Sequence, residues 1–186
     1  MNVKISTLKK KTHSAIKELL DFFEDDPTYF ESESDVRCYL YHLLLSKKIP
    51  YYLILSERKT NKKYIKDSGR HSSQKFDLVV LNPNNANDHN PLIAIELKFG
   101  IARRLEKSAH TSVYHDLAKL NNRKNRVKQA HLIILNSYSL AKSDYRRKII
   151  CLYKKLEIYF DKNANASSYL DIKHIDSKTK KIEYFC

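Results

Sequence analysis

The chain has 186 residues, enough for one domain with a sizeable core, and its 35 Lys and Arg against 21 Asp and Glu give a formal net charge of +14. This excess of cations favours a polyanionic partner. We expect nucleic acid rather than a membrane surface, because no basic helix with a broad apolar face stands out, and only two glycines leave no Walker-type phosphate loop.

The cysteines and the N-terminal residues indicate the compartment. Cys38, Cys151 and Cys186 are widely spaced and form no CxxC pair, which is typical of a reducing cytoplasm. We expect Cys38 and Cys151 to be small core residues on helices. The N-terminus has no apolar leader and no run approaches the length of a membrane span, so a cytoplasmic protein is predicted.

Two helices are predicted at the N-terminal end. Residues 12–24 carry apolar side chains at helical spacing and end in a turn-prone acidic stretch. The second helix begins at Ser32 or Ser34, either of which can cap it, and its buried stripe is Val36, Leu40, Leu43 and Leu44. Glu33 falls in the first turn, where the helix dipole favours a carboxylate, and an ion pair with Arg37 would account for it equally well.

A short strand over residues 51–56 is followed by a basic run that we expect to form a loop. A charge run of this kind is usually a solvated loop. This one leads directly into Asp77, so its cations are also candidates for binding phosphates. His71 could act as a general base or phosphate donor, or be an exposed loop histidine without a role. The cations of the run are Arg58, Lys59, Lys62, Lys63, Lys66, Arg70 and Lys75.

The most informative stretch runs from residue 74 to residue 100. It contains a strand that begins at Asp77, a polar loop with two prolines, and a second strand that carries Glu96 and Lys98 and ends at Gly100. Antiparallel pairing would place Asp77 beside Glu96, and strand alternation puts Glu96 and Lys98 on one face. Two carboxylates suit Mg²⁺ or Mn²⁺ better than zinc, and a nearby lysine would orient water or neutralise charge on the phosphate.

The remaining elements complete an alternating order of helices and strands. A helical region is expected from Gly100 to about Gln129, in which Asp116 and Lys119 either support the site or form a surface pair. Residues 131–136 predict a buried strand, residues 143–160 a helix, and the C-terminal residues a hairpin that extends the sheet or serves a dimer contact. A second basic cluster contains Arg123, Lys124 and Arg126.

Asp77 followed by Glu96-Leu97-Lys98 resembles the motif of the PD-(D/E)XK nuclease superfamily. The residue before Asp77 is Phe76, where that motif has proline. The resemblance implies an α/β protein with a restriction-endonuclease-like αβββαβ core, in which a mixed central sheet is flanked by helices and the metal site lies at one sheet edge. We expect a single domain made of N-terminal packing helices (1–48), the core (49–160) and a C-terminal hairpin tail (161–186).

The resemblance also implies an activity, that of a Mg²⁺- or Mn²⁺-dependent endodeoxyribonuclease. Asp77, Glu96 and the Leu97 carbonyl would bind the metal, Lys98 would serve the water or the transition state, and Glu33 would assist, with Glu31 and Asp35 as rivals. DNA is expected ahead of RNA. The alternatives are a junction resolvase, which would need a homodimer, a noncatalytic nucleic-acid-binding protein on the same fold, and a basic RNA-binding module.

Overall fold

The computed structural model describes residues 3–65, 71–84, 91–100, 108–136, 168–175 and 182–185. The helices are α1 (Ile5–Asp25), α2 (Glu33–Ser46) and α3 (Ser108–Leu120), with short 3-10 turns η1 (Tyr51–Leu53) and η4 (Arg123–Asn125). The strands are β1 (Ile54–Ile65), β2 (His71–Leu81), β3 (Pro91–Phe99), β4 (Gln129–Asn136), β5 (Ser168–Ile175) and β6 (Ile182–Phe185). None of the described helices is both long and apolar enough to cross a membrane.

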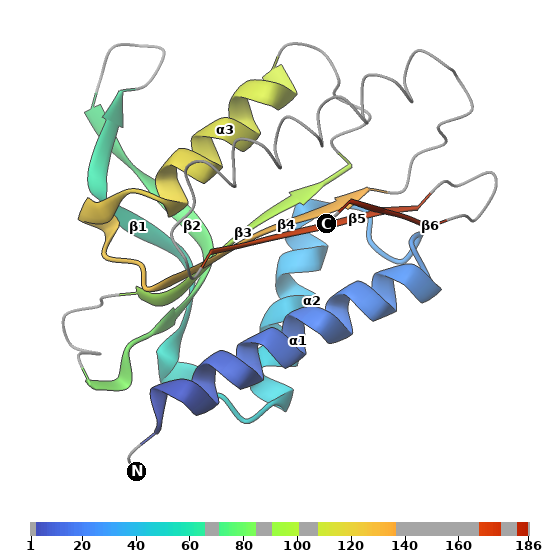
Figure 1. The fold of residues 1–186 in the computed structure, drawn as a ribbon, viewed down its shortest axis with the longest axis horizontal. Coiled ribbons are helices and arrows are strands. Elements are labelled where there is room, and N and C mark those ends of the chain that lie inside the picture. The colour runs from blue at the N-terminus through green and yellow to red at the C-terminus, as the bar shows by residue number, and fades with distance from the viewer. Residues whose placement is uncertain are drawn as a thin grey trace.

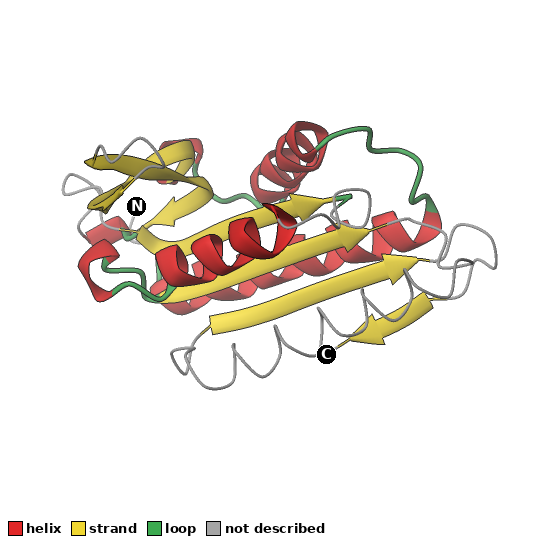
Figure 2. Ribbon diagram, turned by 90° about the horizontal axis from the view of Figure 1, so that it is seen from above, coloured by secondary structure: helices red, strands yellow, loops and turns green. Residues whose placement is uncertain are grey.

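The strands form one open, mixed sheet in the order β1-β2-β3-β4-β5-β6. Strands β1 to β3 are antiparallel neighbours, β3, β4 and β5 run parallel, and β6 returns antiparallel to β5. Helices α1 and α2 lie on one side of this sheet and α3 on the other (Figures 1 and 2). The predicted α/β architecture and the antiparallel pairing of β2 with β3 are therefore confirmed. The helix predicted over residues 143–160 lies outside the described residues.

The core fills the space between the sheet and its helices. The predicted stripe of α2, from Val36 to Leu44, is buried, and so is every residue of β4. Helix α1 starts earlier than residue 12, at Ile5, because Leu8 continues the buried stripe by one turn. Buried apolar side chains of this kind supply most of the free energy that holds helices against a sheet.

A capping box fixes where α2 begins. The Ser32 hydroxyl accepts a hydrogen bond from the Asp35 backbone N–H at 3.2 Å, and the Asp35 carboxylate accepts one from the Ser32 N–H at 2.9 Å. Two backbone donors that the helix leaves unpaired are thereby satisfied. Of the two predicted caps, Ser32 is the one used, and Glu33 consequently occupies the first position of the helix.

The basic run between the first two strands is not the predicted loop. Strand β1 continues to Ile65 and β2 starts at His71, and the two pair as far as Ile65 with His71. Asp77 therefore lies well inside β2 and not at its start. The prediction was wrong because strands without a buried apolar face lack the alternation by which a strand is recognised. Lys66, Gly69 and Arg70 lie outside the described residues.

Three further predictions need correction. Cys38 is exposed, because it lies on α2 two residues from Val36 and from Leu40, a spacing that points it away from the core. Helix α3 ends at Leu120, well before Gln129. The separate turn η4 follows it and is capped by Asn122. The predicted metal ligands Asp77 and Glu96 lie on β2 and β3, which are internal strands, and not on an edge strand. Cys151 is outside the described residues.

The C-terminal strands extend the sheet, which was one of the two predicted alternatives. Strand β5 pairs in parallel with β4, and β6 pairs antiparallel with β5 and forms the edge. The residues that connect β5 to β6 lie outside the described residues. The central strands β3 and β4 are thus covered on both edges, as expected for strands with near-continuous apolar sequences.

We predict that Ser32→Ala lowers the free energy of unfolding by about 1 kcal/mol, because the Asp35 N–H at the start of α2 loses its acceptor. Urea denaturation would measure this loss. Ser14→Ala is the matched control, since Ser14 lies exposed inside α1 and alanine has the higher helix propensity. Equal effects of the two substitutions would contradict a stabilising role for the cap.

Candidate active site

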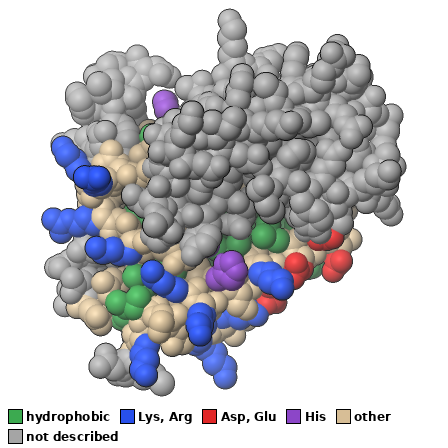
Figure 3. Space-filling model, viewed as in Figure 1, with side chains coloured by type: hydrophobic (Ala, Val, Ile, Leu, Met, Phe, Trp, Pro, Cys, Tyr) green, Lys and Arg blue, Asp and Glu red, His purple; other side chains and the backbone are tan. Residues whose placement is uncertain are grey.

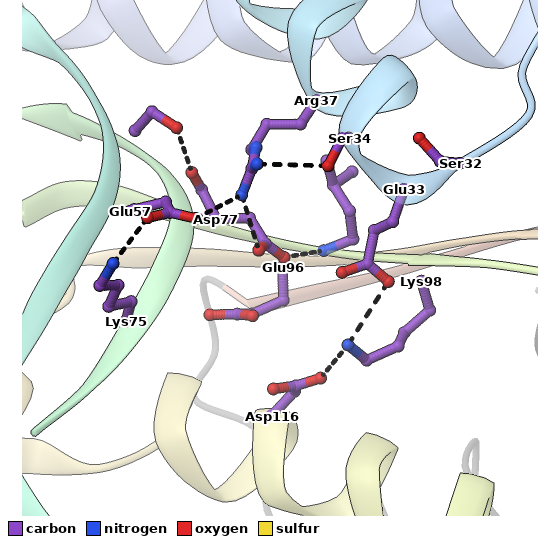
Figure 4. A network of polar contacts seen from close by, with 12 residues as sticks. Ser32, Glu33, Ser34, Arg37, Glu57, Lys75, Asp77, Glu96, Lys98 and Asp116 are labelled. Atoms are coloured by element: carbon purple, nitrogen blue, oxygen red, sulfur yellow. Dashed lines mark hydrogen bonds and ion pairs between the residues drawn. The ribbon is translucent and has the colours of Figure 1, made fainter. Parts of the chain in front are cut away.

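Asp77 and Glu96 lie on adjacent strands at the point where the β2–β3 ladder ends. The last backbone pair before Asp77 is Leu78 with Ile95. Beyond it, the Asp77 carboxylate accepts a hydrogen bond from the Leu97 backbone N–H at 2.8 Å. The Asp77 carboxylate therefore accepts the hydrogen bond that a backbone carbonyl would accept in a continuous ladder. This bond holds the Asp77 carboxylate next to the backbone of Glu96 and Leu97 (Figure 4).

Glu96 is buried and is held by Lys119 of α3. The Lys119 ammonium lies 2.7 Å from Glu96 Oε1 and 3.0 Å from Asp116 Oδ1, and it donates a hydrogen bond to the Lys75 carbonyl at 2.8 Å. Burial, and after it the nearby Asp116 carboxylate, raises the pKa of Glu96 well above its usual range, although Lys119 opposes the shift. The alternative that Asp116 and Lys119 form a surface pair was wrong, because both are buried.

Lys98 reaches acids from one helix on each side of the sheet. Its ammonium lies 2.9 Å from Asp116 of α3 and 3.7 Å from Glu33 of α2 (Figure 4). Burial alone would lower the pKa of Lys98, but the charges of Asp116 and Glu33 outweigh it and the pKa is raised. Lys98 therefore keeps its proton at neutral pH and acts as a positively charged donor.

Glu33, in the first turn of α2, interacts with the charges of Lys98, Asp77 and Asp116. We call the acids Glu33, Asp77, Glu96 and Asp116 the carboxylate cluster. Burial raises the pKa of Glu33, and the charges of Asp77 and Asp116 act in the same direction against Lys98. Its rival Asp35 serves elsewhere, since its carboxylate caps α2 and accepts hydrogen bonds from the Ser32 and Glu31 backbone N–H groups. Glu31 is exposed and precedes the helix. The ion pair that Glu33 makes is with Lys98 and not with Arg37.

Two residues at the outer side of the cluster were not predicted. Arg37 of α2 lies 3.2 Å from Glu57 and 3.9 Å from Asp77, and Glu57 also pairs with Lys75 at 2.6 Å. The hydrogen bond from Lys75, and then its charge, lowers the pKa of Glu57. The register of β1 and β2 places Glu57 opposite Asp77, and Glu57 has a φ of 53°, which is uncommon for a residue other than glycine. Only the register, and no local pattern, could have identified Glu57.

The donor set of this cluster suits a hard cation. Asp77 and Glu96 are the carboxylates that could hold one with the Leu97 carbonyl, and oxygen ligands of this kind are those of Mg²⁺ or Mn²⁺. Glu96 Oε1 and Asp116 Oδ2 are buried without a hydrogen bond of good geometry, so lysine charges alone balance them. Within the described residues, no three His, Cys, Asp or Glu side chains are grouped closely enough to hold a metal ion.

The structure places the predicted nucleic-acid-binding residues in two adjoining regions. Arg58, Lys59, Lys62 and Lys63 lie on β1, and His71 and Lys75 on β2, while Lys66 and Arg70 fall outside the described residues. Lys59 and Lys75 are exposed and Arg58 is half-buried. The second cluster, exposed Arg123, Lys124 and Arg126, lies at η4, which contacts β1.

No protein-family model, curated protein or solved structure matches this chain. Its function must therefore be inferred from the chemistry of the cluster itself.

We predict that Lys119→Met lowers the free energy of unfolding by about 3–5 kcal/mol, because it leaves the buried carboxylates of Glu96 and Asp116 without their shared cation. Adding Glu96→Gln should recover part of this loss in a double-mutant cycle measured with urea. Lys47→Met is the control, since Lys47 pairs with Glu18 at the surface, and we expect a loss of under about 1 kcal/mol. Similar losses in Lys119→Met and Lys47→Met would show that the buried ion pairs of Lys119 stabilise the protein no more than a surface ion pair does.

The raised pKa of Glu96 predicts a pH dependence of stability. Between the ordinary value of 4.5 and the raised folded value, the folded protein holds a proton that the unfolded chain has lost. The free energy of unfolding of the wild type should therefore fall, relative to Glu96→Gln, as the pH rises through this window. Urea denaturation over a pH series would measure the difference.

Glu57→Gln is the control for this pH series. The pKa of Glu57 is lowered from 4.5, so its contribution is present above that value and is lost only as the pH falls below it. A difference between wild type and Glu96→Gln that stays constant above pH 4.5 would show that Glu96 titrates normally.

Proposed function

We propose that the protein is a Mg²⁺-dependent nuclease that hydrolyses phosphodiester bonds within DNA. The observation that carries this proposal is the meeting of Asp77, Glu96 and Lys98, from two adjacent strands, with Glu33 from a flanking helix. The net charge of +14 supports a polyanionic substrate. A cluster of carboxylates beside a charged lysine is a composition suited to metal-dependent hydrolysis of phosphodiester bonds.

Asp77, Glu96 and the Leu97 carbonyl would hold the ion, and a bound Mg²⁺ would polarise the phosphate and lower the pKa of a water. The chain prepares for this by anchoring Asp77 on the Leu97 N–H and Glu96 on Lys119. The raised pKa values of Glu33 and Glu96 mean that their negative charges are only partly compensated, so an added cation would be favoured there. Preformed carboxylates reduce the reorganisation needed in the reaction.

Lys98 and Glu33 have complementary roles in this proposal. Lys98 has a raised pKa and keeps its charge, so it would stabilise the negative charge that builds up on the phosphate oxygens and would not remove a proton. Glu33 is partly exposed, and burial raises its pKa above the ordinary value; a more basic carboxylate suits a group that accepts a proton from the attacking water. Lys98 would thus stabilise charge, and Glu33 would transfer the proton.

The same proposal includes the finer fold, a restriction-endonuclease-like αβββαβ core. It is supported by the order α2, β1, β2, β3, α3, β4, in which an antiparallel meander is followed by a helix and a strand parallel to β3. Helix α3 connects β3 to β4 across one face of the sheet, and this crossover brings Asp116 and Lys119 over Glu96 and Lys98.

We expect purified protein to cut supercoiled plasmid in Mg²⁺ or Mn²⁺ but not in EDTA. Asp77→Asn and Lys98→Met should each slow cutting by about 100-fold or more, while binding in EDTA largely remains. The first substitution weakens the metal site, and the second removes the positive charge beside the reacting phosphate. Asp21→Asn and Lys17→Met are matched controls, since both residues lie exposed on α1, and they should leave the rate unchanged. Circular dichroism would establish that all variants are folded.

Other substrates separate the remaining possibilities. Faster cutting of branched oligonucleotides than of plasmid would favour a junction resolvase, and the oligomeric state would then be measured. If plasmid, branched DNA, single-stranded DNA and RNA all remain intact while binding persists, the proposal is wrong and the protein is a binding module. Full activity of Asp77→Asn would also contradict it.

A further inference from the structure

Strands β1 and β2 continue beyond the sheet as a two-stranded ribbon. Strand β2 pairs with β3 only between Leu78 and Leu81, whereas its pairing with β1 runs on to Ile65 and His71. We call residues Arg58–Ile65 with His71–Phe76 the basic ribbon. In Figures 1 and 2 it projects from the sheet as a hairpin. No third strand covers it among the described residues.

The basic ribbon is anchored at its base to the carboxylate cluster. The Lys75 carbonyl accepts a hydrogen bond from Lys119, the residue that also holds Glu96. Phe76 is buried, and the Lys119 ammonium lies 5.8 Å from the centre of its ring. Higher up, the register shifts between Lys59 and Lys63, and Thr60 Oγ1 accepts a hydrogen bond from the Gln74 N–H at 3.1 Å. Such a bulge increases the twist of a ribbon.

The described residues of the ribbon carry positive charge without any acid. They include the cations Arg58, Lys59, Lys62, Lys63 and Lys75 and no Asp or Glu. The turn η4, with Arg123, Lys124 and then Arg126, contacts β1 and adds to this charge. On the face shown in Figure 3, Lys and Arg side chains lie along the margin where Figure 1 places η4, and acidic side chains lie toward the C-terminal end of α1.

We propose that the basic ribbon enters the major groove of duplex DNA and delivers the adjoining backbone to Asp77 and Glu96. This inference rests on the proposed function, and it specifies duplex DNA as the substrate. A two-stranded ribbon fits the major groove of B-form DNA, which is about 12 Å wide. At about 3.3 Å per residue, the β1 half of the ribbon spans about 26 Å, the length of about eight base pairs.

The same geometry excludes the other polyanions as preferred partners. The major groove of A-form RNA is deep and narrow, so a ribbon cannot enter it. Single strands offer no groove for the ribbon to enter. The ribbon should therefore distinguish a DNA duplex from an RNA duplex of the same sequence. Cations at η4, beside β1, would contact the phosphates that border the groove.

Binding in EDTA tests this inference independently of cleavage. Fluorescence anisotropy would measure the affinity for a labelled DNA duplex, for the matching RNA duplex and for one of the DNA strands, over a salt series. A duplex of about 20 base pairs is longer than the stretch of about eight base pairs that the ribbon spans. The ribbon variant is Lys59→Ala/Lys62→Ala/Lys63→Ala. The charge-matched control is Lys4→Ala/Lys10→Ala/Lys17→Ala, whose residues are exposed and lie at the start of α1 or along it.

We expect the wild type to bind the DNA duplex at least about tenfold more tightly than the RNA duplex, because only B-form DNA admits the ribbon. The ribbon variant should lose about tenfold or more in affinity for the DNA duplex, and its plot of log affinity against log salt should become shallower by about three, since each lysine contributes about one. The control should keep the wild-type slope. Replacing the same three ribbon lysines by arginine should restore both affinity and slope, since the charge is retained.

The possible results separate this inference from the nuclease proposal. Equal affinity for DNA and RNA duplexes, or equal losses in the ribbon variant and its control, would overturn the ribbon inference even if plasmid is cut. Ribbon-dependent binding of duplex DNA without any cutting would support the ribbon and overturn the nuclease proposal.

Discussion

Lys119 brings a positive charge into the interior of the protein, and the surrounding acids can be buried only because that charge is there. Its ammonium meets Glu96, Asp116 and the Lys75 carbonyl, which belong to β3, α3 and β2. Removing such ions from water costs several kcal/mol each, and the cost is offset only when every charge has a partner at close range. The contacts of Lys119 therefore hold α3 against β2 and β3 at the carboxylate cluster.

The charged residues around Lys119 form two groups, and both lie where the pairing of β2 with β3 ends. On the inner side, Glu96, Lys119, Asp116, Lys98 and Glu33 alternate in sign. On the outer side, Arg37 bridges Asp77 to Glu57, and Glu57 continues to Lys75. The carboxylates still repel one another, since burial and neighbouring acids raise the pKa values of Glu33 and Glu96. A cation added there would relieve repulsion that the lysines leave uncompensated.

Strand β2 connects the surface of the protein to this cluster. Its first residues pair only with β1 and belong to the basic ribbon, Asp77 follows next to Leu97, and Leu78 to Leu81 are buried in the sheet. A single strand therefore passes from the basic ribbon, past the carboxylate cluster, into the core. Because a strand is rigid when both its ends are paired, a polyanion held along the ribbon would be placed at a defined distance from Asp77.

The features that depend on local periodicity could be predicted from the order of the residues alone. The buried stripe from Val36 to Leu44, the apolar strand at residues 131–136 and the placement of Glu96 and Lys98 on one strand all follow from the spacing of side chains along a helix or strand. The pairing of β2 with β3 followed from the length of the polar connection. These arguments were enough to predict Asp77 next to Glu96, whereas the place of Glu33 at the site was predicted only from the resemblance.

Only the tertiary structure decided which charged residues meet. The contacts of Lys119 with Glu96 and of Arg37 with Glu57 join residues that are far apart in the chain, and the exposure of Cys38 depends on how α2 rotates against the sheet. The extension of β1 and β2 into a ribbon was equally hidden, because its polar residues lack apolar alternation and its backbone hydrogen bonds are made between strands. Periodicity reports the face on which a residue lies, whereas its partner is set by packing between elements.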